Sequence, residues 1–147
     1  MKPTRENLVE YAVEPLARWL IDHALRGGKM LYKDAKGRLE QDHGFSTIFP
    51  IMLGYPAGEM MWRMQAVDRK VPLLNVLLVR GDTEYPGAGA GEFLAEWADR
   101  PSLKQSKARI KFRNLWETTC DEAEAEVRAY GKPAWAKVFH KTFGVPL

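Results

Sequence analysis

Cysteine is almost absent from this chain of 147 residues, in which Cys120 stands alone. A single cysteine cannot form an intramolecular disulfide, and it cannot supply the several thiolates of a cysteine-based zinc site. No apolar run reaches the ~18 residues that span a bilayer, and the start of the chain shows no signal peptide. We therefore expect a cytoplasmic protein without a membrane partner.

Acidic residues are absent from one tract of the sequence. Between residues 100 and 113 there are six cations and no acid, whereas residues 117–126 contain five acids and no lysine or arginine. The net charge of +3 and the pI of about 9.0 are mild, so an anionic partner is permitted but not required. The informative feature is the segregation of charge along the chain. The six cations are Arg100, Lys104, Lys107, Arg109, Lys111 and Arg113.

Composition and periodicity predict one domain, 1–147, of mainly α structure with a minor strand component (α+β). Hydrophobic residues make up 46% of the chain, which is enough for a core. We expect Thr4 to cap a first helix, Pro15 to kink it or begin a second one, and Gly27 to help end it. Further helices are expected at 30–40, 57–67, 91–98 and 133–143, with breaks at 42–44 and 54–56.

Three further segments carry specific expectations. Ser46 is expected to cap a buried turn at 48–53. The run 71–79 is almost wholly apolar, which fits a strand buried on both faces. A helix is expected from Pro101 to Tyr130, although the alternation at 107–113 also fits a short strand. We find no internal repeat and no linker.

The basic tract is the leading candidate site. If 101–116 is helical, Lys104, Lys107 and Lys111 share one face, and such a stripe would bind phosphates with salt-dependent affinity. The alternatives are a solvated face, or a partner for the acidic stretch that follows. Four cations outside the tract are additional candidates for nucleic-acid contact: Arg63, Arg69, Lys70 and Arg80.

Catalytic and cofactor sites have weaker support. Asp82 and Glu84 follow the predicted strand, where two-metal nucleases often place carboxylates, and Glu59 or His43 would be the further ligand. The alternative is that both acids are turn residues. Cys120, on an apolar helix face among acids, is expected to be a buried structural thiol. We expect no bound cofactor, and the sequence favours a non-enzymatic role.

The sequence GAGAGEF at 87–93 is rich in small residues. Backbone N–H groups near 89–91 would suit an anion at a helix start. The spacing matches neither the dinucleotide fingerprint nor a P-loop. The alternative is that small residues stand there because two chain segments pass closely.

Residues 30–95 resemble the winged-helix domain of DNA alkyltransferases and alkyltransferase-like proteins. The resemblance lies in a tyrosine-bearing turn, LYKDA at 31–35, followed by helices and then by PLLNV at 72–76 before a Gly/Pro-rich turn. Leu73 stands where the alkyl-acceptor cysteine falls, and Leu74-Asn75 replaces a His-Arg pair, so alkyl transfer is excluded. The resemblance implies DNA binding, with 57–67 as recognition helix and 80–86 as wing.

Three functions follow as hypotheses. The leading one is a nucleic-acid-binding protein that uses the 100–113 tract, with the choice of DNA or RNA left open by the residues themselves. The second is a non-catalytic protein-interaction module that uses exposed methionines and tryptophans, with a second copy of the chain as one partner. The third is a metal-dependent nuclease.

Overall fold

The computed structural model describes residues 1–147 and is mainly helical. A single pair of short strands is its only sheet, so the predicted fold class is confirmed. The helices are α1 (Arg5–Tyr11), α2 (Val13–Arg26), α3 (Tyr32–Asp42), α4 (Gly54–Val67), α5 (Gly91–Ala98), α6 (Ala108–Lys111), α7 (Arg113–Tyr130) and α8 (Lys132–Phe143). The strands are β1 (Met30–Leu31) and β2 (Leu78–Val79), and the 3₁₀ turns are η1 (Pro50–Leu53), η2 (Leu74–Leu77), η3 (Ala88–Ala90) and η4 (Pro101–Lys104).

The first two helices begin and end where their local signals predict. The Thr4 side chain accepts a hydrogen bond from the backbone N–H of Asn7, and α1 starts at the next residue. Pro15 lies in the first turn of α2, where the missing N–H breaks no hydrogen bond. Gly27, with φ +101°, ends that helix in a conformation that favours glycine.

The predicted strand 71–79 is wrong over most of its length. Only Leu78–Val79 is strand, and it pairs in parallel with Met30–Leu31, while Leu74–Leu77 forms a 3₁₀ turn. The whole run is nevertheless buried. A continuous apolar pattern reports burial, and it does not distinguish a strand from another buried conformation.

The expectations for 46–56 are confirmed only in part: Pro50–Leu53 is a turn, and Ile48 and Leu53 are buried. Ser46 donates a hydrogen bond from its hydroxyl to the Met1 carbonyl at 3.1 Å and caps no helix. Ile51 in the predicted buried turn is 89% exposed. The predicted break at 54–56 is the first turn of α4, because Pro56 is tolerated there and the 3₁₀ turn η1 leads directly into the helix.

The long helix expected from Pro101 to Tyr130 is broken into η4, α6 and α7. Phe112, with φ −120° and ψ 50°, separates α6 from α7. The strand alternative for 107–113 is wrong as well, because 108–111 is helical. The cations of this tract therefore do not form one helical stripe.

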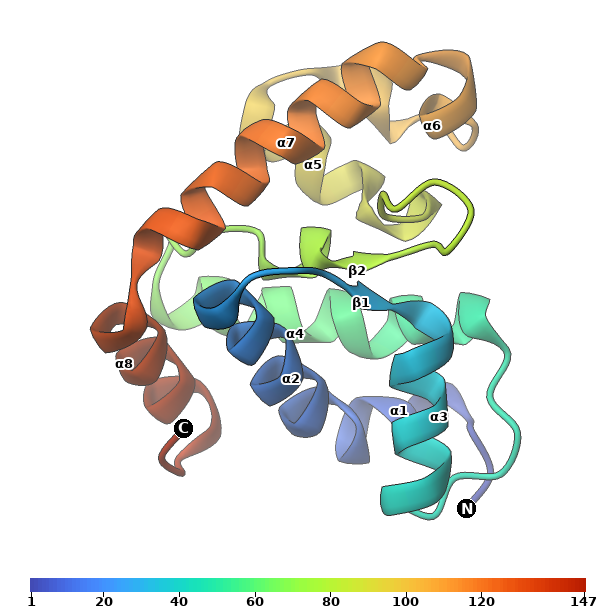
Figure 1. The fold of residues 1–147 in the computed structure, drawn as a ribbon, viewed down its shortest axis with the longest axis vertical. Coiled ribbons are helices and arrows are strands. Elements are labelled where there is room, and N and C mark those ends of the chain that lie inside the picture. The colour runs from blue at the N-terminus through green and yellow to red at the C-terminus, as the bar shows by residue number, and fades with distance from the viewer.

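One cluster of 36 buried residues forms the hydrophobic core and draws on nearly every element. In Figure 1 the strand pair crosses the middle of the molecule, with α1 to α4 and α8 on one side and α5, α6 and α7 on the other. The loop that follows β2 therefore runs between these two groups of helices. None of the helices combines the length and the hydrophobicity that a membrane crossing requires.

Candidate functional site

A cleft of about 830 Å³ opens beside the loop that follows β2. Its walls come from segments far apart in the sequence: the start of α3, η1 and the first turns of α4, η2 with β2, the loop 80–90, and one residue of α6. This volume lies in the range of small-molecule sites. The fold therefore brings five separate parts of the chain to one hollow.

Asn75 lines this cleft and is only 5% exposed. Its Oδ1 atom is buried and accepts no hydrogen bond. The backbone of η2 is satisfied independently, since the N–H of Leu78 donates to the Asn75 carbonyl. An unpaired buried acceptor costs free energy, so such groups in native proteins call for an explanation. Because Asn75 lines the cleft, a polar ligand that reaches this oxygen would supply the missing partner.

Tyr32 and Lys33, at the start of α3, line the same cleft. The Tyr32 hydroxyl accepts a hydrogen bond from the N–H of Gly87 at 3.1 Å, which ties α3 to the loop 80–90. Burial raises the pKa of Tyr32, so its hydroxyl keeps a proton to donate at neutral pH. Lys33 is exposed and forms no ion pair in the structure.

Arg80 and Asp82 face each other at the cleft wall. The guanidinium donates from Nε and Nη2 to the two carboxylate oxygens at 2.9 and 2.8 Å. This hydrogen-bonded arginine holds the pKa of Asp82 below its usual range. The charge of Asp82 is thus compensated by Arg80. Lys33 and Arg109 are the positive charges of the cleft that have no acid partner.

The metal candidates are not brought together. Glu84 has a left-handed φ of 60°, and its backbone carbonyl accepts a hydrogen bond from Lys29. Glu59 pairs with Arg63, and His43 lies edge-on to Trp19. No group of three or more histidine, cysteine, aspartate or glutamate side chains is close enough to hold a metal ion. Asp82 and Glu84 belong to the turn, as the alternative interpretation predicts.

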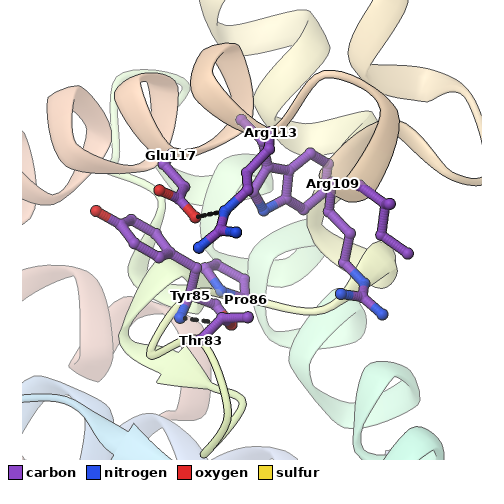
Figure 2. Close-up of a pocket in the computed structure, with 8 residues that line it drawn as sticks. Thr83, Tyr85, Pro86, Arg109, Arg113 and Glu117 are labelled. Carbon is purple, nitrogen blue, oxygen red and sulfur yellow. Dashed lines mark hydrogen bonds and ion pairs between the residues drawn. The ribbon is translucent and has the colours of Figure 1, made fainter.

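A second hollow of about 250 Å³ adjoins the cleft and shares Pro86 and Arg109 with it. Figure 2 shows Arg109 and Arg113 on the helices above the Tyr85–Pro86 segment. Arg113 is held by Glu117 at 3.0 Å, whereas Arg109 makes no ion pair. Trp116 contributes to the lining, and its buried Nε1–H has no acceptor. The cleft is thus lined by Asn75, which has an unpaired acceptor, and the second hollow is lined by Trp116, which has an unpaired donor.

The six cations of the basic tract separate into two groups. Arg100 bonds to Thr119 and to Glu122, and Arg113 bonds to Glu117, so these two are partners of the acidic stretch on α7. The other four have no acid partner, and their three lysines are exposed. We call this second group the basic edge: Lys104, Lys107, Arg109 and Lys111.

The additional cations lie elsewhere, with one exception. Arg80 is at the cleft, but Arg63 donates to the Val9 carbonyl at 3.1 Å and pairs with Glu59, which ties α4 to α1. Arg69 and Lys70 are exposed in the turn after α4 and line neither hollow. Of the ten candidate nucleic-acid contacts, three therefore lie at the two hollows: Arg80, Arg109 and Arg113.

Two other sequence interpretations are settled by burial. The methionines of α4 belong to the core, since Met60, Met61 and Met64 are fully buried. Among the five tryptophans Trp62 is the exposed one, at 67%, with its ring edge-on to Phe93. The methionines of α4 therefore offer no contact surface to a protein partner, whereas Trp62 does.

The glycine-rich segment is explained in part by close packing. A Cβ atom on Gly91 would lie 2.6 Å from the Leu103 carbonyl oxygen, and one on Gly89 would contact Gly54 at 3.9 Å. Small residues do stand where two segments pass closely. Ala88 and Gly89, at the beginning of η3, also line the cleft, where the first N–H groups of a helix lack intrahelical partners.

Comparison with known proteins gives no match: no family model, no curated protein and no solved structure is significantly similar to this chain. Tyr32, Lys33 and Asn75 were missed as site residues by sequence reasoning. A usable signal existed for one of them, because Asn75 is the only polar side chain in the apolar run 71–79.

Proposed function

We propose that this chain is a small cytoplasmic protein that binds single-stranded nucleic acid, DNA in the first instance, along the basic edge and across the two hollows. The observation that carries the proposal is the position of Arg109. It has no acid partner and it lines both hollows. A phosphate bound to Arg109 would therefore place the nucleosides on its two sides within reach of the cleft and of the second hollow.

The basic edge supplies the electrostatic part of binding. Lys104, Lys107 and Lys111 are exposed cations without acid partners, and each can release a counterion from a phosphate backbone. Lys104 ends η4, and Lys107 and Lys111 lie at the two ends of α6, the short helix whose Arg109 lines both hollows. A flexible single strand can follow such an irregular line.

The hollows favour a single strand over a duplex. Bases of an unpaired strand can leave the stack and present their polar edges, whereas those of a duplex are paired. The unpaired Oδ1 of Asn75 can accept a hydrogen bond from a base edge, and the unpaired Nε1–H of Trp116 can donate one to a phosphate oxygen. The resemblance to winged-helix domains would instead place 57–67 on DNA, but α4 is covered by α1, α2 and α8 along much of its surface.

The test is fluorescence anisotropy with labelled single- and double-stranded oligonucleotides of DNA and RNA at about 50 and about 200 mM salt. We expect single-strand binding that weakens steeply with salt. Lys107→Glu combined with Lys111→Glu should abolish it and leave the melting temperature nearly unchanged, because both side chains are exposed and unpaired.

The matched control is Lys132→Glu combined with Lys137→Glu. It changes the net charge by the same amount with exposed, unpaired lysines of α8, which lies at the other end of the molecule in Figure 1. Equal binding by both double variants would reject the basic edge. Loss of the labelled strand only when magnesium is present would replace the proposal with the nuclease hypothesis.

A further inference from the structure

We propose that the 830 Å³ cleft is a nucleotide-binding pocket, in which a heterocyclic base donates a hydrogen bond to Asn75 and the attached phosphate meets Lys33, Arg80 and Arg109. The ligand chemistry is a phosphate ester that carries a polar ring. Its source is either a free mononucleotide or one unstacked nucleotide of a bound strand. The inference deepens the proposed function and rests on it.

The base end of the pocket is defined by Asn75. This residue is only 5% exposed, yet no group donates a hydrogen bond to its amide oxygen. The amino and ring N–H groups of nucleobases are donors of the required kind, and an asparagine amide can pair with a base edge in a bidentate manner. Inorganic phosphate has no ring to fill the part of the cleft next to Asn75, so we expect it to bind more weakly than a nucleotide.

The phosphate end is defined by positive charge. Lys33, Arg80 and Arg109 come from three different elements and line one cleft, against the single carboxylate of Asp82, so the lining has an excess of two positive charges. The protonated Tyr32 hydroxyl is a further donor. Hydrogen bonds between charged donors and phosphate are stronger than those between neutral groups.

The remaining wall suits a flat ring. Gly54, Gly58 and Gly89 leave backbone without side chains beside the hollow, so a planar group can approach closely. At the rim, the Ile51 side chain is 89% exposed, an uncovered apolar surface that a base would cover. The cleft therefore has an apolar and flat part as well as its polar ends, as a nucleotide requires.

The experiment measures binding of the four deoxyribonucleoside and the four ribonucleoside 5′-monophosphates, of the matching nucleosides and of inorganic phosphate by isothermal titration calorimetry. We expect at least one monophosphate to bind more tightly than its nucleoside and than phosphate. Asn75→Leu should weaken that binding about tenfold or more, the effect of one lost hydrogen bond to a buried partner. Lys33→Glu, an exposed change, should weaken it as well.

The Asn75→Leu variant also separates a binding role from a structural one. Because its amide oxygen has no partner in the protein, replacing it with an apolar side chain of similar size should leave the melting temperature unchanged or raise it. A large loss of stability would assign Asn75 to folding and overturn its role in binding. Lys33→Glu, compared with the Lys132→Glu control, tests the phosphate end of the pocket independently of Asn75.

Two further arms separate this inference from the proposed function. Oligonucleotides that bind wild type, Asn75→Leu and Lys33→Glu equally, with no mononucleotide binding, would overturn the pocket and leave the proposed function in place. Mononucleotide binding that is lost in both cleft variants, without oligonucleotide binding, would support the pocket as a site for free nucleotides and overturn the proposed function. Parallel loss of both ligands in the cleft variants would support the two together.

Discussion

A Cβ atom placed on Gly91 would lie 2.6 Å from the carbonyl oxygen of Leu103, so a glycine lets the start of α5 touch the η4 turn. Gly91 has ordinary helical angles, and its requirement is therefore space and not conformation. We predict that Gly91→Ala lowers the free energy of unfolding by about 1–3 kcal/mol, the usual cost of overpacking. Urea denaturation followed by circular dichroism measures the change.

The control is Gly37→Ala in the middle of α3, where an added Cβ atom meets nothing within 4 Å. That substitution should raise stability by about 0.5–1 kcal/mol, because alanine loses less backbone entropy in a helix. A Gly91→Ala protein as stable as Gly37→Ala would contradict the contact between α5 and η4.

Arg128 joins the last turns of α7 to the end of α2. Its guanidinium donates to the backbone carbonyls of His23 and Gly28 and pairs with Glu124 at 3.1 Å. We predict that Arg128→Met destabilises the protein by about 1–3 kcal/mol, because the carbonyls of His23 and Gly28 and the carboxylate of Glu124 each lose a donor. Arg26→Met is the matched control, since that arginine is 77% exposed and pairs only with Asp22. It should cost about 0.5 kcal/mol or less in the same urea titration.

The elements that could be predicted from sequence are those with local end signals. Thr4, Gly27 and Gly131 mark ends that depend on neighbouring residues only, and the predicted bounds of α5 agree with the structure. The break between α6 and α7 has no such signal. It lies at Phe112, which is neither glycine nor proline and has φ −120° and ψ 50°.

The candidate site was predictable in its charges but not in their pairing. Arg113 and Glu117 are four residues apart, a spacing that favours an ion pair in any helix that contains both, whereas Arg100 and Glu122 lie on separate elements and no spacing predicts their contact. Lys33 reaches the cleft only because β1 pairs with β2, a contact between segments almost fifty residues apart. No local pattern reports such a contact.

Cys120 should be almost unreactive in the native protein. Burial, with Asp121 nearby, raises the pKa of its thiol to about 12, so the nucleophilic thiolate is scarce near neutral pH. We predict that a thiol reagent at about pH 8 modifies the native chain on the order of a hundredfold or more slowly than the urea-unfolded chain. Equal rates in the two states, followed by mass spectrometry, would show an accessible thiol and contradict the packing around α7.

Stability should fall in strong alkali through two tyrosines. Burial, together with hydrogen bonds to Asp121 and Asp68, raises the pKa of Tyr85 and of Tyr130 from 10.0 to about 12. The folded chain therefore binds these protons more tightly than the unfolded chain does. Their contribution is complete below pH 10 and is lost as the pH rises to about 12.

The measurement is the melting temperature between those pH values for wild type and for Tyr85→Phe combined with Tyr130→Phe. The double variant should be less stable near neutral pH and should lose stability less steeply in alkali. Cys120 titrates in the same range and remains in both proteins, so it cancels from the comparison. If the melting temperatures of the two proteins fall in parallel as the pH rises, the hydrogen bonds of these hydroxyls to Asp121 and Asp68 do not stabilise the folded state.

The division of the basic tract predicts how binding depends on salt. A lysine of the basic edge that contacts a phosphate releases about 0.7 counterion from a single strand, so Lys107→Ala should reduce the slope of log K against log salt by about 0.7. Arg100→Ala removes the same formal charge, but its guanidinium is held by Thr119 and Glu122 on α7. That variant should leave the slope unchanged. Anisotropy titrations at several salt concentrations give both slopes. An equal reduction by the two variants would mean that overall charge, and not the absence of acid partners, selects the residues that meet nucleic acid.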